Sequence, residues 1–243
     1  MNKYIYGLNA VYELVKSRPE DIKSIWLNDD KSLRKQNLIK ILDDLNLPYQ
    51  IRPKQDFIQL MPRSDNHQGI VAFVIKIKEY KDKSWLLKRL KENEQEQMTI
   101  LILDSILDPQ NFGAILRSAV AFGVEIIIIG KHNNAPLSAT TYKSAAGAVE
   151  HLSIVQVNNL NQLLGSLKDA DFWIYGLTGE AKQNIAEIKF DKKRALILGS
   201  EGAGIRHLVK ENCDFLVKIP INKKQESLNV SVACAVVLYH LSL

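Results

Sequence analysis

Cysteine, glycine and proline are scarce in this sequence of 243 residues, and long apolar runs are missing. Two cysteines, Cys213 and Cys234, are too few for a disulfide framework, so we expect inert thiols in a reducing compartment. The 12 glycines and 7 prolines, without any internal repeat, argue against low-complexity and solenoid proteins. The longest nearly apolar stretch, residues 230–239, is about half a membrane span. The first residues do not resemble a secretory signal, and we therefore expect a cytoplasmic protein.

Several catalytic motifs are missing as well. The 5 histidines lie far apart, without metal-ligand spacing to one another or to the cysteines, so we expect no metal site. The sequence contains no G-x-S-x-G, which excludes a nucleophile elbow. It also lacks G-x-G-x-x-G and a Walker lysine, which argues against an α/β enzyme with a nucleotide cofactor.

What is present describes a globular protein with a mild positive charge. Hydrophobic residues make up 46% of the chain and charged residues 24%, which excludes disorder or a coiled coil as descriptions of the whole chain. The length suffices for one large domain or two modest ones. The formal net charge of +5 is spread along the chain and permits a polyanionic partner such as a nucleic acid.

The pattern of the sequence predicts two domains joined by a linker. Residues 1–75 alternate helix-like and strand-like segments, which predicts a small α/β domain with an early helix capped by Asn9. Residues 76–97 are rich in charge. They form either a solvated linker or exposed helix, or a basic strip that touches RNA. Residues 98–243 then form a second, larger domain.

Short apolar runs without alternation dominate this second domain. They lie at residues 100–103, 126–129, 153–157, 172–175, 195–198 and 215–219. Such runs indicate strands covered on both faces. Helix-like segments separate several of them, at residues 112–122 and 160–167, which predicts a parallel sheet with crossover helices. Ligand sites in such sheets lie at the carboxyl ends of the strands.

Polar or glycine-containing loops follow three of these runs. The first contains Asp108-Pro-Gln-Asn-Phe-Gly-Ala-Ile-Leu-Arg117, in which Asn111 can cap a helix and Arg117 suits an anion such as phosphate. The second contains Leu198-Gly-Ser-Glu-Gly-Ala-Gly204, whose glycines let backbone amides face a ligand. The third contains Ile219-Pro-Ile and Ser227-Leu-Asn-Val-Ser-Val232, in which Ser227 and Asn229 are good caps for an apolar helix.

These three stretches, in this order, resemble the signature motifs of the SpoU (TrmH/RlmB-like) RNA ribose 2′-O-methyltransferases of the SPOUT class. Three other stretches look like the same family, namely Ser144-Ala-Ala-Gly-Ala148, Gly7-Leu-Asn-Ala-Val11 and His67-Gln-Gly-Ile70. The resemblance therefore covers nearly the whole chain. One departure is Lys223, which stands where the third motif of the family usually has glycine.

The resemblance implies a fold, a cofactor and partners. The C-terminal domain should be a parallel-sheet α/β domain with a deep trefoil knot that binds S-adenosylmethionine, and it should work as a homodimer. The N-terminal domain should resemble the ribosomal L30e/L7Ae group and hold RNA. The chain looks most similar to the RlmB type, whose members methylate a guanosine in large-subunit (23S) rRNA. Methylation of tRNA is the near alternative, and a non-catalytic RNA-binding protein of the same fold is a further one.

The resemblance also assigns roles to residues. Arg117 is the residue credited with activating the ribose hydroxyl, but a guanidinium with a pKa above about 12 rarely gives up its proton. We therefore expect Arg117 to clamp the target phosphate, Asn111 to orient the ribose, and Glu201 and Asn229 to hold Arg117 or the loop. The expected catalytic set is Arg117, Asn111, Glu201, Ser227 and Asn229. The expected cofactor-binding set is Thr178, Gly179, Leu198, Gly199, Ile219, Ile221 and Leu228. The candidate RNA contacts of the N-terminal domain are Arg18, Arg34, Lys35, Arg52, Lys54 and Arg63.

Overall fold

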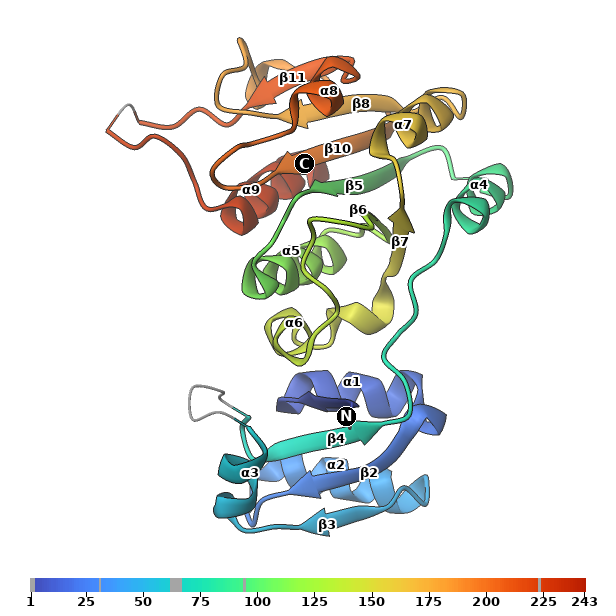
Figure 1. Cartoon of the computed structure of the whole chain (residues 1–243), viewed down its shortest axis with the longest axis vertical. Coiled ribbons are helices and arrows are strands. Elements are labelled where there is room, and N and C mark those ends of the chain that lie inside the picture. The colour runs from blue at the N-terminus through green and yellow to red at the C-terminus, as the bar shows by residue number, and fades with distance from the viewer. Residues whose placement is uncertain (1–2, 31, 62–66, 94, 223) are drawn as a thin grey trace. The chain divides into compact units, whose positions relative to one another are not determined.

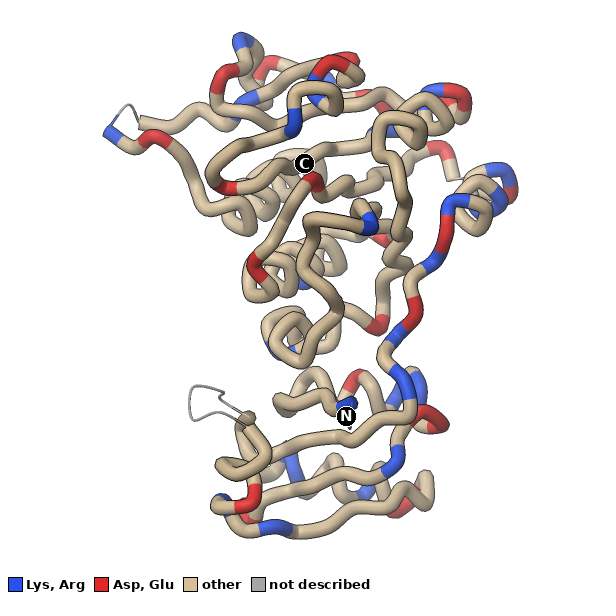
Figure 2. The backbone as a smooth tube through the Cα atoms, in the orientation of Figure 1, with Lys and Arg blue, Asp and Glu red and all other residues tan. Residues whose placement is uncertain are grey.

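The computed structural model describes residues 3–30, 32–61, 67–93, 95–222 and 224–243, and it divides into two compact units. The first unit combines Met1–Glu79 with Leu137–Glu150, and the second combines Tyr80–Pro136 with His151–Leu243. Figure 1 shows the helices and strands of each unit, and Figure 2 shows that lysines and arginines occur in both units.

The first unit is built on a four-stranded sheet in the order β1-β4-β2-β3. Strands β1 and β2 are antiparallel to β4, and β3 is parallel to β2. The elements are β1 (Lys3–Tyr6), α1 (Leu8–Ser17), β2 (Ile22–Leu27), α2 (Leu33–Asp44), β3 (Tyr49–Ile51), α3 (Lys54–Leu60), β4 (Ile70–Val74) and α6 (Ala139–Ala145). The predicted α/β character of this region is confirmed, whereas β1 and α3 were not predicted.

The first helix shows where the capping prediction was wrong. Helix α1 begins one residue before Asn9, and Gly7 occupies the N-cap position with a φ of 96°. Glycine adopts this positive φ without steric cost. A Cβ at this position would also lie 2.6 Å from the Lys143 side chain, so space as well as conformation favours glycine. Asn9 therefore lies inside the first turn and caps nothing.

Segment 137–150 follows a strand of the second unit in sequence but packs in the first. Arg18 donates to both carboxylate oxygens of Glu150, at 2.8 and 2.9 Å, and the Glu150 side chain is 1% exposed. Lys78 Nζ donates to the carbonyls of Val149 and Glu150, each at 2.8 Å. The buried pair, with its hydrogen bonds satisfied, ties this segment to the N-terminal sheet.

Two of the candidate RNA contacts are engaged inside the first unit. Arg18 is bound by Glu150 and by Asp21, at 2.7 Å. Lys35 is 3% exposed and donates to Asn28 and Asp30. These two predictions were wrong because the charges serve the fold. Arg34, Arg52 and Lys54 reach the surface, and Arg63 lies outside the described residues.

The second unit is built on a seven-stranded sheet in the order β7-β6-β5-β10-β8-β11-β9, and all of its strand pairs are parallel. Its strands are β5 (Met98–Asp104), β6 (Ile126–Gly130), β7 (Ser153–Val157), β8 (Trp173–Leu177), β9 (Gln183–Asn184), β10 (Lys193–Gly199) and β11 (Phe215–Lys218). Its helices are α4 (Lys83–Lys91), α5 (Pro109–Ala121), α7 (Leu160–Lys168), α8 (His207–Glu211) and α9 (Val230–Ser242). The predicted parallel sheet is confirmed.

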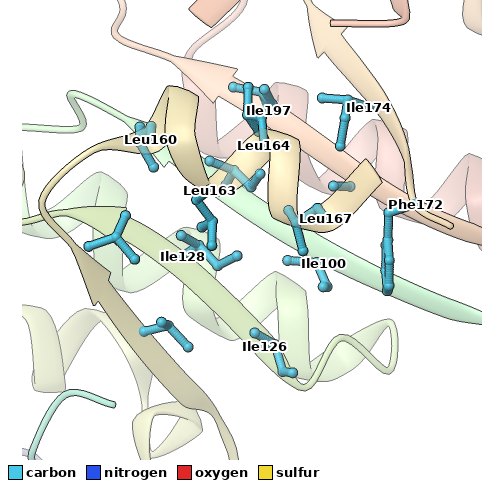
Figure 3. Close-up of a cluster of buried hydrophobic side chains, with 14 of the residues drawn as sticks. Ile100, Ile126, Ile128, Leu160, Leu163, Leu164, Leu167, Phe172, Ile174 and Ile197 are labelled. Carbon is cyan, nitrogen blue, oxygen red and sulfur yellow. The ribbon is translucent and has the colours of Figure 1, made fainter. Parts of the chain in front are cut away.

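Helices cover both faces of this sheet, as its uninterrupted apolar runs predicted. On one face, four leucines of α7 point into a cluster with Ile100, Ile128, Ile174 and Ile197 (Figure 3). The charged segment before β5 forms α4, which buries Leu86 in the same cluster and keeps its lysines in solvent. Helices α5 and α9 pack against each other, and α9 contacts β10. The knot expected from the resemblance stays a prediction.

None of the helices in the described part of the chain is long and apolar enough to span a membrane.

Candidate active site

Three side chains from the three signature loops meet at the carboxyl edge of the large sheet. Asn111 Nδ2 donates to Glu201 Oε1 at 2.8 Å, and Asn229 Nδ2 donates to the same oxygen at 2.6 Å. Asn229 Nδ2 also lies 3.0 Å from Asn111 Oδ1. Glu201 and Asn229, which lie 90 and 118 positions after Asn111 in the sequence, thus form one hydrogen-bonded triangle with it. We call it the amide–carboxylate triangle.

Helix capping explains how two corners of this triangle are placed. Asp108, and not Asn111, is the N-cap of α5, where its carboxylate accepts from the amides of Gln110 and Asn111 at 3.1 Å. Asn111 was predicted as the cap, but its side chain is instead free to reach Glu201. Of the two caps predicted for α9, Asn229 is confirmed, and its Oδ1 accepts from the amide of Ser231 at 2.9 Å. Ser227 lies two residues before the cap position and was wrongly predicted as a cap. A helix N-terminus therefore fixes the backbone of Asn111 and the side chain of Asn229.

The loop that carries Glu201 is closed on itself. Ser200 and Gly204 exchange two backbone hydrogen bonds of 3.0 Å. A Cβ at Gly199 would lie 2.1 Å from the carbonyl carbon of Gly204, so the turn requires glycine at the end of β10. This tight turn presents Glu201 to the two asparagines.

An ion pair with a buried carboxylate, which the sequence analysis did not predict, anchors the other end of this loop. Asp104 is fully buried at the end of β5, where it is the neighbour of Gly199 in the sheet. Its carboxylate accepts from Arg206 Nε at 2.7 Å and from the Arg206 amide at 2.9 Å. The signal in the sequence was an aspartate that ends an otherwise apolar strand.

Arg117 lies outside the amide–carboxylate triangle. It is exposed on α5, six residues after Asn111, and makes no hydrogen bond or ion pair within the described residues. Glu201 and Asn229 therefore join the loops and do not hold Arg117. An exposed guanidinium with all of its donors available can bind a phosphate from solution.

The residues expected to bind the cofactor lie at the ends of three adjacent strands, β10, β8 and β11. The Thr178 amide donates to Val217 O at 2.9 Å, which joins the ends of β8 and β11. Leu198 is buried, while Gly199, Ile219 and Leu228 are partly exposed and Ile221 is 38% exposed. Ser227 is exposed in the same loop as Leu228, and Lys223 lies outside the described residues.

This edge fits S-adenosylmethionine in its chemistry. Partly exposed aliphatic side chains suit a flat purine, and exposed backbone at Gly179 suits a ligand that is read by main-chain groups. A Cβ at Gly179 would contact nothing within 4 Å, which leaves open space beside the backbone.

The two thiols do not contribute a nucleophile. Burial raises the pKa of Cys213 to about 11 and that of Cys234 to about 12. Both groups are therefore protonated at neutral pH, in agreement with the expectation of inert thiols.

Comparisons with known proteins identify the family of this chain. The family model described as SpoU rRNA Methylase family matches residues 98–239, and the model described as RNA 2'-O ribose methyltransferase substrate binding matches residues 4–80. The chain is 39% identical to the 23S rRNA (guanosine-2'-O-)-methyltransferase RlmB of Coxiella burnetii over 98% of this chain and 94% of the relative. It is 37% identical to RlmB of Escherichia coli strain K12 over 98% and 97%.

A solved structure supports the fold. The SpoU methyltransferase AviRb from Streptomyces viridochromogenes, in complex with the cofactor AdoMet, matches with a TM-score of 0.79 at 19% identity, over 98% of this chain and 88% of AviRb. With the parallel sheet, the signature loops at its carboxyl edge and the two family models, the conclusion is that this chain belongs to the SpoU rRNA methylase family.

Proposed function

We propose that the protein transfers a methyl group from S-adenosylmethionine to the ribose 2′-oxygen of a guanosine in 23S rRNA. The amide–carboxylate triangle carries the proposal, because it joins all three signature loops at the edge where a parallel sheet binds its ligands. The relatives named above carry this activity, at coverage of nearly their whole length. Such a substrate fits a cytoplasmic protein.

Positioning is the main task of the chain in this reaction. The sulfonium of the bound cofactor supplies an activated methyl group. The protein must hold the ribose hydroxyl in line with that group, and good alignment contributes on the order of 7–11 kcal/mol. Glu201 and Asn229 orient the amide of Asn111, and in this proposal that amide would hydrogen-bond the ribose. Thr178, Gly179, Leu198, Gly199, Ile219, Ile221 and Leu228 would hold the cofactor, and Ser227 lies in the same loop.

Arg117 is assigned to the phosphate of the target nucleotide. Its planar fork binds a phosphate through two parallel hydrogen bonds, and its charge lowers the pKa of the nearby hydroxyl. A phosphate oxygen or a water molecule then accepts the proton, because the guanidinium itself stays protonated.

We also propose that the protein is a homodimer that uses the outer face of α9. Val232, Val236 and Tyr239 are 49%, 37% and 56% exposed and recur at helical spacing. Their buried neighbours Cys234, Val237 and Leu238 face inward. An exposed apolar stripe of this kind marks an interaction surface. Light scattering should give the mass of a dimer for the wild type and of a monomer for Val236→Asp.

Methyl transfer to separated RNAs tests the activity. The protein is incubated with labelled S-adenosylmethionine and with either 23S rRNA or total tRNA, each lacking the modification. We expect label in 23S rRNA. Label in tRNA alone would assign the chain to the alternative substrate. Absence of transfer, together with no calorimetric heat on titration with S-adenosylmethionine, would identify a non-catalytic RNA-binding protein.

A further inference from the structure

One face of the small sheet in the first unit is aromatic and incompletely covered. The register places Ile5, Ala72 and Ile25 in one row, and all three are fully buried. The adjacent row, Tyr4, Phe73 and Ser24, points to the opposite face, and its members are only partly buried. Strands turn successive side chains to opposite faces, so the second row belongs to an open surface.

Trp26 lies at the centre of this face. Its ring packs edge to face with Phe73 at 4.9 Å and with Phe57 of α3 at 6.2 Å. The Arg52 guanidinium lies 5.2 Å from the centre of the same ring and is held by Gln50 and Asp56. Helix α3 thus covers part of the face and leaves Trp26 and Phe73 partly exposed.

The uncovered part is a positively charged hollow. A cavity of about 240 Å³ is lined by Lys3, Lys23, Ser24, Trp26, Phe73 and Val74. Lys3 and Lys23 are exposed, and neither forms an ion pair with any residue that the structure describes. The lining contains no carboxylate. Aromatic rings and unpaired lysines therefore line the same hollow.

We propose that this hollow is a docking surface for a single-stranded part of the RNA substrate, with bases stacked against Trp26, Phe73 and the Arg52 guanidinium and phosphates bound by Lys3 and Lys23. The inference rests on the proposed RNA substrate and names where part of it binds. Every base has a π-face, so aromatic side chains on an open sheet hold unpaired bases with little sequence preference. Lysines at the rim complement the phosphates. A duplex keeps its bases stacked within the helix and offers no free π-face to these rings.

Fluorescence of Trp26 tests the stacking directly. The chain has 3 tryptophans, so the full-length variant Trp85→Phe with Trp173→Phe leaves Trp26 as the only source of tryptophan fluorescence. It is titrated with a single-stranded oligoribonucleotide of about 10 nucleotides, within the usual range of site sizes, and with the same strand annealed to its complement. We expect the single strand to quench Trp26 and the duplex to leave its emission unchanged. Unchanged Trp26 emission with the single strand, or equal quenching by both RNAs, overturns the proposal.

Charge reversal tests the phosphate contacts. Lys3→Glu with Lys23→Glu is compared with Lys16→Glu with Lys40→Glu, which changes the net charge equally at exposed sites on α1 and α2. In the first variant we expect the KM for 23S rRNA to rise. The slope of the logarithm of the RNA-binding constant against the logarithm of the salt concentration should become less steep by about 0.7 per lost phosphate contact. The affinity for S-adenosylmethionine and the kcat at saturating RNA should not change.

The two proposals fail in different ways. If the wild type methylates 23S rRNA but both charge variants show the same KM, the docking surface is wrong and the proposed function stands. If the wild type transfers no methyl group to RNA, the proposed function fails, and the Trp26 titration still reports whether single-stranded RNA binds this face.

Phe73→Leu, which keeps an apolar side chain, should weaken oligoribonucleotide binding by about tenfold if one base stacks there. Unchanged binding argues against stacking on Phe73.

Discussion

The two units of this chain use their sheets differently. The large parallel sheet is covered on both faces, and the amide–carboxylate triangle lies at the carboxyl ends of its strands. One face of the small mixed sheet is buried, and the other face carries aromatic and basic residues that are only partly covered. A reaction needs a few groups held in fixed geometry, which strand-end loops on a rigid core supply. Binding of a flexible polymer needs area and charge, which an open sheet face supplies.

Among the variants of the large unit, loss of Arg117 should have the largest effect, and this effect should be on kcat. Arg117→Ala removes the charged group that we propose binds the phosphate of the reacting nucleotide, so we expect kcat to fall by about 10²–10³-fold. Because the side chain is exposed and unpaired within the described residues, thermal stability should not change. Arg89→Ala, an exposed arginine of α4 with only a 3.8 Å pair to Glu125, is the matched control and should keep full activity.

Arg117→Lys separates charge from geometry. Lysine keeps the positive charge but cannot form the two parallel hydrogen bonds of the guanidinium. Methylation by this variant at the wild-type rate would contradict the clamp.

Arg206→Ala should have the next largest effect, on stability. The change removes the side-chain donor to the fully buried Asp104 carboxylate, so we expect a loss of about 1–3 kcal/mol in the free energy of unfolding. Lys210→Ala breaks a pair with the exposed Glu180 on the same unit and should hardly shift the denaturation midpoint. Similar midpoints for the two variants would show that the Asp104 pair does not anchor the loop.

The coupling of Asn111 and Asn229 should be smaller. If the triangle acts as one unit, Asn111→Ala and Asn229→Ala are not additive, and their coupling in kcat/KM should be about 0.5–3 kcal/mol. Asn229→Asp keeps the α9 cap and loses the donor to Glu201, so it separates a capping effect from a loss of the triangle. Strict additivity of the two alanine variants would argue that the residues act separately.

The smallest effect concerns alkaline pH. Burial raises the pKa of Cys213 to about 11 and that of Cys234 to about 12, above the usual value of about 8.5 in an unfolded chain. The unfolded state loses these protons first, so stability is fully present below about pH 8.5 and falls as pH rises toward the folded values. Thermal midpoints between pH 8 and 10 should fall less for Cys213→Ala with Cys234→Ala than for the wild type. Equal slopes would show that these thiols do not contribute.

Much of this architecture could be predicted from the sequence, because burial on both faces of a parallel sheet leaves long apolar runs. The runs at residues 100–103 and 126–129 predicted β5 and β6 to within a few residues. Strand β1 was missed because its four residues, Lys3–Tyr6, carry no clear alternation. Helix α6 was missed because its polar, threonine-containing sequence is held by tertiary contacts such as the Arg18–Glu150 pair nearby.

The sequence predicted which residues belong to the site better than it predicted how they contact one another. The motifs identified Asn111, Glu201 and Asn229, but spacing along the chain cannot show that both asparagines donate to one carboxylate oxygen. The cap of α5 was assigned to Asn111 because asparagine and aspartate compete for such positions, and Asp108 satisfies two amides at once. Asp104 was not singled out because a partner 102 residues away is invisible in a local pattern.

Mapping of the methylated position tests the central claim most directly. Wild-type protein labels 23S rRNA with methyl-labelled S-adenosylmethionine, and the RNA is then hydrolysed with alkali, which cleaves beside every free 2′-hydroxyl. The account predicts that the label stays in a single alkali-resistant dinucleotide with guanosine at its 5′ position, and that Arg117→Ala forms almost none of it. Label released as mononucleotides, which carry the methyl group on a base, would contradict it.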